Sequence, residues 1–351
     1  MPRKKQPAMK YEVIESLLKI TKDEWHDLRS TGLGGSDAGA VFGESPWTSA
    51  FALWAQKSGR VERNVTENEA MAWGTLLEDS VAEKFAADYN KPVVRWPVML
   101  RSVAHPFMLA NLDFVIVEGG EFEAGVVTSW EELTPPPGTI TAILEIKTTG
   151  IVGRPNHRAW EDDGVPRTYE LQGLHYTCVL GPEVTNSVVF AALVAGEGLV
   201  VRQRDYTPEQ QAEAIQRETE FWDLVKSGTP PEVDGHNATL DTLGALYPTH
   251  QEGVVAEADE FVYETYEKFV QTNEAKKQLE QEVKALRAQL EQAVGDAEAL
   301  AFMGQTLFTF KATKDTEAFD VKAFKEAMPD VWAQFVRPKS GYRVMRLKGE
   351  A

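Results

Sequence analysis

The chain has 351 residues, of which 43% are hydrophobic and 26% are charged, which is an ordinary composition for a globular protein of one or two domains. Its formal net charge of −18 argues against a protein that merely coats nucleic acid, because phosphate binding usually needs a basic surface. The single cysteine, Cys178, excludes an internal disulfide and a cysteine zinc cluster.

The start of the chain is basic, but no apolar segment of the kind found in secretory signals follows it. No apolar run approaches the length of a membrane span either. We therefore expect a cytoplasmic protein without a membrane partner.

The first candidate site residues lie near the N-terminus. A capping box at Thr21 predicts a short helix that ends near Arg29. A glycine-rich segment, 33–40, follows, in which Ser36 is expected to cap a second helix whose free N–H groups favour an anion. Arg29 could grip a phosphate there. The alternative is a simple corner in which a glycine turn joins two helices and the arginine is exposed.

Residues 71–90 predict a helix, because Leu77, Val81 and Phe85 form an apolar stripe at helical spacing. Glu78 lies next to this stripe rather than opposite it. We therefore expect its carboxylate to face a cleft beside the core.

The segment 141–149 is predicted to be a strand, since it is rich in β-branched and aliphatic residues and has no Gly or Pro. Side chains alternate along a strand, so Glu145 and Lys147 share one face. Asp113 lies in a second apolar strand segment, and antiparallel pairing would bring it beside Glu145. Two such carboxylates suggest a divalent metal site. The alternative is a surface strand with an ordinary cross-strand ion pair.

The next segments complete an α/β pattern. Residues 150–167 are expected to form a loop that carries Arg154 and Arg158, and residues 169–180 a helix that carries Gln172. A strand pair, 187–194 and 198–206, and a further helix starting at Thr207 follow. Helices and strands in this order predict one mixed sheet flanked by helices, in a domain of residues 1–235.

The composition changes after residue 235. Residues 236–300 are interpreted as a linker and a long helix, 258–300, with heptad spacing of apolar residues. Residues 301–351 are expected to form a small basic α+β appendage. Its predicted elements are a helix, 321–327, between two paired strands, 305–312 and 342–347.

Several segments together resemble the phage lambda exonuclease and YqaJ-like viral recombinase family. The resemblance covers roughly residues 20–230 and rests on motifs that occur in the family's order. They are Trp25-His-Asp-Leu-Arg-Ser, Gly34-Gly-Ser-Asp-Ala-Gly, Trp73-Gly-Thr-Leu-Leu-Glu-Asp, Leu112-Asp113, Leu144-Glu-Ile-Lys-Thr and Tyr169-Glu-Leu-Gln-Gly-Leu-His-Tyr. The resemblance implies a restriction-endonuclease-like PD-(D/E)XK fold. The family often has proline before the first acidic residue, where this chain has Leu112, but proline is not a ligand.

The resemblance also implies roles for individual residues. Glu78, Asp113 and Glu145, with the carbonyl oxygen of Ile146, would bind Mg²⁺, for which Mn²⁺ could substitute. Lys147 would position or activate the attacking water, and Gln172 would support the site. Arg29 and Ser36 would hold the 5′-phosphate of the DNA, and Arg154 and Arg158 are both candidates for a further DNA-binding arginine.

The implied activity is a Mg²⁺-dependent exonuclease that digests duplex DNA ends 5′ to 3′ and leaves 3′ single strands for recombination. A homotrimer, a single-strand annealing protein as partner and, for a phage protein, the host-cell cytoplasm are further expectations from the resemblance. The alternatives are a catalytically silent DNA-binding or assembly protein of the same fold and a RecB-like nuclease of different polarity. A Cas4-like enzyme is disfavoured, because one cysteine cannot hold an iron–sulfur cluster.

Overall fold

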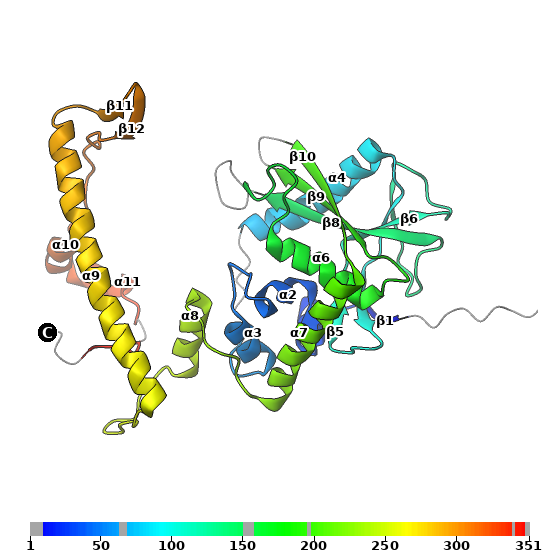
Figure 1. The fold of residues 1–351 in the computed structure, drawn as a ribbon, viewed down its shortest axis with the longest axis horizontal. Coiled ribbons are helices and arrows are strands. Elements are labelled where there is room, and N and C mark those ends of the chain that lie inside the picture. Colours follow the sequence, from blue (N-terminus) through cyan, green and yellow to red (C-terminus); the bar gives the residue numbers. More distant parts are fainter. Residues whose placement is uncertain (1–9, 63–68, 150–157, 195–197, 339–340, 348–351) are drawn as a thin grey trace, which may run out of the picture. The chain divides into compact units, whose positions relative to one another are not determined.

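The computed structural model describes residues 10–62, 69–149, 158–194, 198–338 and 341–347. The chain divides into two compact units, residues 1–248 and 249–351 (Figure 1). None of the helices in the described ranges is long and apolar enough to cross a membrane.

A six-stranded mixed sheet forms the centre of the first unit (Figure 1). Its strands are hydrogen-bonded in the order β10-β9-β8-β6-β3-β7. They are β3 (Val93–Arg95), β6 (Phe114–Glu118), β7 (Val127–Ser129), β8 (Thr139–Thr149), β9 (Ser187–Val194) and β10 (Gly198–Asp205). The longest strand, β8, pairs antiparallel with β6 and parallel with β9. The expected α/β class with a mixed sheet is therefore confirmed.

Helices lie on both faces of this sheet (Figure 1). The helices of the first unit are α1 (Lys22–Ser30), α2 (Gly35–Val41), α3 (Ala50–Lys57), α4 (Glu69–Tyr89), α6 (Arg167–Leu180), α7 (Pro208–Ser227) and α8 (Asn237–Leu246). Val81 of α4 shares a core cluster with Ile146 of β8, whereas Leu171 of α6 shares another cluster with Ile143. Since side chains alternate along β8, Glu145 lies on the α6 face. A mixed sheet with helices on both faces is the arrangement that the order of helices and strands predicts.

A smaller sheet brings the segment after α1 next to the strand that precedes Asp113. Its order is β1-β4-β5-β2. The strands are β1 (Tyr11–Ser16), β2 (Leu33–Gly34), β4 (Val98–Ser102) and β5 (Met108–Ala110). β2 pairs in parallel with β5, with Leu33 opposite Met108. The capping box predicted at Thr21 is confirmed, with both of its reciprocal hydrogen bonds present.

The end of the first unit is held by a contact to the start of α3. The Thr239 hydroxyl donates a hydrogen bond of 2.7 Å to the hydroxyl of Ser49, and both residues are buried. Thr207 caps α7 with a capping box and Pro208 follows it, as helix-start preferences predict. Because Thr239 belongs to α8, its contact with Ser49 places this helix in the first unit, which extends to residue 248.

The second unit contains one long helix and several short elements. They are α9 (Glu260–Val294), β11 (Ala299–Phe302), β12 (Gln305–Thr309), α10 (Val321–Ala327) and α11 (Pro329–Phe335). On the heptad stripe of α9, Leu279, Val283 and Leu286 are each more than half exposed. The predicted helix 321–327 is confirmed.

Two predictions for this unit are wrong. The long helix ends at Val294 instead of 300, and residues 305–309 pair with 299–302 rather than with 342–347, which form no strand. The physical reason is the turn between the paired strands. Met303 and Gly304 have positive φ values of 49° and 82°, as a two-residue hairpin turn of type I′ requires at both positions. This local hairpin replaces both the last helical turns and the distant strand pairing.

Candidate active site

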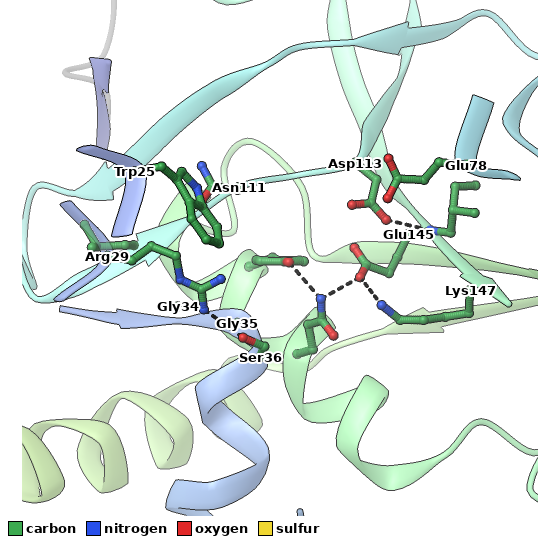
Figure 2. Close-up of a pocket in the computed structure, with 14 residues that line it drawn as sticks. Trp25, Arg29, Gly34, Gly35, Ser36, Glu78, Asn111, Asp113, Glu145 and Lys147 are labelled. Carbon is green, nitrogen blue, oxygen red and sulfur yellow. Dashed lines mark hydrogen bonds and ion pairs between the residues drawn. The ribbon is translucent and has the colours of Figure 1, made fainter. Parts of the chain in front are cut away.

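A cavity of about 250 Å³ gathers most of the site residues predicted from the sequence. Those that line it are Arg29, Ser36, Glu78, Asp113, Glu145, Ile146, Lys147 and Gln172. In Figure 2, Arg29 and Ser36 lie at one end of the pocket, and Glu78, Asp113, Glu145 and Lys147 lie at the other. Arg158 is exposed and is not one of the described lining residues, and Arg154 lies outside the described residues.

The pairing of β6 with β8 places Asp113 beside Glu145. Phe114 lies opposite Leu144 in antiparallel register, so Asp113, one residue earlier, lies opposite Glu145, one residue later. Asp113 Oδ2 accepts a hydrogen bond of 2.9 Å from the backbone N–H of Ile146. The Ile146 side chain is buried in the core, so this residue contributes its backbone to the cavity. The predicted juxtaposition of the two carboxylates is confirmed.

Glu145 is the most enclosed carboxylate of the site, with 1% of its surface exposed. Its Oε1 accepts hydrogen bonds of 2.5 Å from Lys147 Nζ and from Gln172 Nε2. Gln172 Nε2 also donates to the Tyr176 hydroxyl at 2.8 Å, which fixes the amide orientation. Glu145 Oε2 is buried and has no hydrogen-bond partner among the described residues. A buried carboxylate oxygen without a donor is costly and marks a position where a cation would fit.

The pKa values of all three carboxyl groups are raised, and burial is the largest cause for each of them. Burial, followed by the charge of Asp113, raises the pKa of Glu78 to about 7 and the pKa of Glu145 to about 8. Burial also raises the pKa of Asp113. Burial alone would lower the pKa of Lys147, but the charges of Glu145 and Asp113 raise it, so the amine stays protonated. One ammonium group therefore faces three potential negative charges.

The residues present fit a divalent cation by their chemistry. The candidate ligands are carboxylate oxygens, which suit Mg²⁺ and Mn²⁺, and a bound cation would offset both the cost of burying these charges and the repulsion that Asp113 exerts on Glu78 and Glu145. Within the described part of the chain, the side chains as they stand do not form a ready group of three or more metal ligands. Basic side chains instead contact two of these carboxylates. Lys147 donates a hydrogen bond to Glu145 Oε1, and Arg95 lies 3.8 Å from a Glu78 oxygen.

The opposite end of the cavity is a basic corner. Arg29 Nη2 donates a hydrogen bond of 2.7 Å to Ser36 Oγ, and its guanidinium lies 5.0 Å from the ring centroid of Trp25. Arg29 Nε is buried without a partner among the described residues, so a donor is available. The expectation that Ser36 caps α2 is wrong. Gly34 occupies the N-cap, because the Asp37 carboxylate binds its N–H and the Ser36 hydroxyl accepts from Arg29.

Asp37 holds this corner in place, a role that the sequence reasoning missed. Its Oδ2 accepts the N–H of Gly34 at 2.9 Å and lies 3.0 Å from Lys57 Nζ, while Oδ1 is 3.8 Å from Arg29. Burial alone would raise the pKa of Asp37, but Lys57 and Arg29 lower it to about 2. The available signal was an acidic residue three positions after a helix N-cap.

Trp25 and Asn111 also line the cavity, at the same end as Arg29 (Figure 2). The Trp25 indole N–H donates to Asn111 Oδ1 at 3.2 Å, and Asn111 Nδ2 donates to the carbonyl of Val98 at 3.1 Å. Trp25 belongs to the first of the motifs that carry the family resemblance. Asn111 carried no sequence signal, because its partner is 86 residues away.

Comparison with known proteins identifies relatives of this chain. The model of the YqaJ-like viral recombinase domain matches residues 24–183. The protein YqaJ of Bacillus subtilis (strain 168) is 31% identical over 338 residues, which cover 96% of this chain and 97% of that protein. A protein of African swine fever virus (strain Badajoz 1971 Vero-adapted) is 39% identical over 72 residues, or 18% of this chain and 21% of that protein.

Among solved structures, an alkaline exonuclease (LHK-Exo) from Laribacter hongkongensis is 13% identical, with a TM-score of 0.44. The match covers 59% of this chain and 94% of that one. A putative exonuclease from Eubacterium rectale is 12% identical, with a TM-score of 0.39, and the match covers 69% of this chain and 97% of that one.

Proposed function

Since the chain belongs to the YqaJ-like viral recombinase family, we propose that it is a metal-dependent deoxyribonuclease that digests duplex DNA from its ends. One observation carries this proposal. A single cavity holds three carboxyl groups and a lysine at one end and a guanidinium with an available donor at the other. The first end suits a phosphodiester that is hydrolysed, and the second suits a terminal phosphate.

In the proposed mechanism, Glu78, Asp113 and Glu145 would hold one or two Mg²⁺ ions, for which Mn²⁺ could substitute. A cation bound there supplies an activated water and neutralises charge on the phosphate. Lys147 is protonated and donates hydrogen bonds to the water or to the scissile phosphate, where negative charge develops. Gln172 holds Glu145 Oε1 and so orients the carboxylate.

The basic corner gives the proposed reaction its direction. Arg29 and Ser36 bind the 5′-terminal phosphate, because a guanidinium with an unused N–H matches phosphate oxygens. A strand held by its 5′ end is then cut at the first phosphodiester that reaches Lys147. Digestion proceeds 5′ to 3′ and leaves a 3′ single strand.

The family resemblance leads us to propose two partners as well. The protein would act as a homotrimer, and a single-strand annealing protein would take up the 3′ single strand. Light scattering coupled to size-exclusion chromatography tests the trimer, for which the expected mass is three times 39.1 kDa. A monomer mass would contradict it.

The experiment for the activity uses linear duplexes labelled at either the 5′ or the 3′ end, with and without a 5′-phosphate, in Mg²⁺ or in EDTA. We expect Mg²⁺-dependent release of the 5′ label first, and faster release with the 5′-phosphate. Arg29→Ala should remove the advantage of the 5′-phosphate, a loss of roughly tenfold to 100-fold for a charged hydrogen bond. The matched control is Arg101→Ala, since Arg101 pairs with Glu12 on the surface of the smaller sheet.

Each alternative has its own outcome in this assay. First release of the 3′ label would contradict the proposed polarity and favour a RecB-like nuclease. The absence of digestion in Mg²⁺ and in Mn²⁺ would contradict the nuclease proposal and favour a catalytically silent DNA-binding or assembly protein.

A further inference from the structure

An exposed tryptophan lies beside the candidate active site and has no part in the proposed mechanism. Trp47 is in the irregular segment 44–49 between α2 and α3, and 58% of its surface is exposed. Single exposed apolar residues are common, so exposure alone means little. The surroundings of Trp47 distinguish it.

Trp47 is the outer member of an aromatic stack that reaches Lys147. The centroid of its ring lies 6.3 Å from that of half-buried Tyr169, with an angle of 26° between the ring planes. The Lys147 ammonium lies 4.8 Å from the same Tyr169 ring. Trp160, which is 3% exposed, supports Tyr169 from the core at 6.2 Å. The exposed indole is thus joined through one ring to the lysine that is proposed to bind the scissile phosphate.

Hydrogen bonds hold the backbone around Trp47, and the stack on Tyr169 holds its ring. Ser45 Oγ accepts the N–H groups of Trp47 and Thr48, each at 3.2 Å. Ser49 then caps α3 by accepting the N–H of Ala52 at 3.0 Å. A ring that is held before a ligand arrives loses little conformational entropy on binding, which favours affinity.

We propose that Trp47, backed by Tyr169, is a stacking subsite for a nucleobase of the DNA strand whose phosphate lies at Lys147. The proposal rests on the proposed nuclease function. Every base has a π-face, so stacking on an aromatic ring accepts any sequence, as a nuclease that digests along a strand requires.

The charge of the chain makes such a contact useful. With a formal net charge of −18, the protein as a whole repels phosphate, and attraction must come from local contacts. Base stacking contributes affinity that does not depend on net charge. It also holds the strand next to Lys147 while the terminal phosphate is held elsewhere.

The test measures DNA binding in EDTA by fluorescence anisotropy, so that cleavage is not needed. The probes are 5′-phosphorylated, 3′-fluorescein duplexes that carry one abasic residue at each of the first four positions from the 5′ end. For the wild type, we expect one position at which the missing base raises Kd by about fivefold to 100-fold. Trp47→Ala should raise Kd for intact DNA to a similar extent and abolish the effect of that abasic position, whereas Trp47→Phe should retain most of it.

The control variant is Tyr89→Ala. Tyr89 is 50% exposed and stacks on Phe85 with 4.9 Å between centroids, so it matches Trp47 in exposure and ring contact but lies at the C-terminal end of α4. This variant should bind all duplexes like the wild type. A Trp47→Ala protein that keeps the full abasic effect would overturn the subsite.

One further outcome would show that Trp47 is a contact between subunits, and another would separate the subsite proposal from the nuclease proposal. If Trp47→Ala binds DNA like the wild type but changes the subunit number in size-exclusion chromatography, the ring is a contact between copies, and the subsite is wrong. If the wild type shows the abasic effect but digests no DNA in Mg²⁺ or Mn²⁺, the subsite stands and the nuclease function fails.

Discussion

Removing the charge of Asp37 is expected to destabilise the basic corner of the cavity. Asp37 lies 3.0 Å from Lys57 and 3.8 Å from Arg29, and it accepts the backbone N–H of Gly34. These interactions outweigh burial and lower its pKa from 3.8 to about 2. At 1.36 kcal/mol per pKa unit, that difference corresponds to about 2 kcal/mol of folding free energy at neutral pH.

The Asp37→Asn variant should therefore lose about 2 kcal/mol, or about 4–8 °C of melting temperature in a unit of this size. The sign of the pH effect follows from the lowered pKa. The stabilisation is present above the unfolded pKa of 3.8 and disappears as the pH falls through the folded pKa of about 2. The wild type should lose this contribution at acid pH, and Asp37→Asn should not.

The assay is thermal unfolding followed by circular dichroism, with urea unfolding at several pH values. The matched control is Asp88→Asn, because Asp88 forms an exposed i,i+4 pair with Lys84. Such a pair contributes about 0.3–0.5 kcal/mol. If Asp37→Asn and Asp88→Asn melt at the same temperature, the reasoning about the buried cluster is refuted.

Three other changes have defined outcomes. His175 Nδ1 lies 2.8 Å from the buried Glu218 carboxylate, and its Nε2 lies 2.8 Å from the carbonyl oxygen of Leu109. Although burial lowers the pKa of His175, Glu218 raises it above the usual value. The stabilisation that the His175–Glu218 pair contributes is present below pH 6.5 and is lost as the pH rises through the pKa of His175 in the folded protein. The melting temperature of the wild type should therefore fall with rising pH more steeply than that of Glu218→Gln. Gly35→Ala would place a Cβ 2.5 Å from the Tyr176 ring, so it should lower both melting temperature and nuclease rate, and unchanged values of both would contradict the tight contact. Mg²⁺ or Mn²⁺ should raise the melting temperature of the wild type and have less effect on Asp113→Asn, and equal shifts would argue against that ligand.

Local sequence rules were sufficient for the elements that carry the carboxylates. Alternation along a strand places Glu145 and Lys147 on one face, and helical spacing places Glu78 beside an apolar stripe. Pairing of neighbouring strands then brings Asp113 next to Glu145. Each of these steps depends on residues that are close in sequence or on adjacent strands, which is why the cavity could be anticipated.

Contacts between distant segments could not be predicted in this way. Asp37 and Lys57 belong to different helices, and Trp25 reaches Asn111 across 86 residues. The stack of Trp47 on Tyr169 joins residues from separate parts of the fold. No local pattern encodes these pairs, because they depend on how elements that are distant in the sequence pack together.

In the C-terminal unit, a local feature of the chain was missed. Its heptad pattern predicted one helix to residue 300, but a two-residue turn at Met303 and Gly304 creates a hairpin from residues 299–309. The signal was weak, since Met-Gly is not a typical hairpin turn pair.

The roles assigned to Arg154 and Arg158 stay predictions.

The central claim is that the carboxylates and Lys147 form a metal-dependent hydrolytic site, and the most direct measurement compares wild type and Lys147→Ala on a linear duplex. The rate of nucleotide release is measured in Mg²⁺ and in EDTA, with DNA binding by anisotropy to show that the variant still engages its substrate. The account predicts digestion by the wild type in Mg²⁺ alone and a rate at least about 100-fold lower for the variant. Equal rates for the two proteins, or full digestion in EDTA, would contradict it.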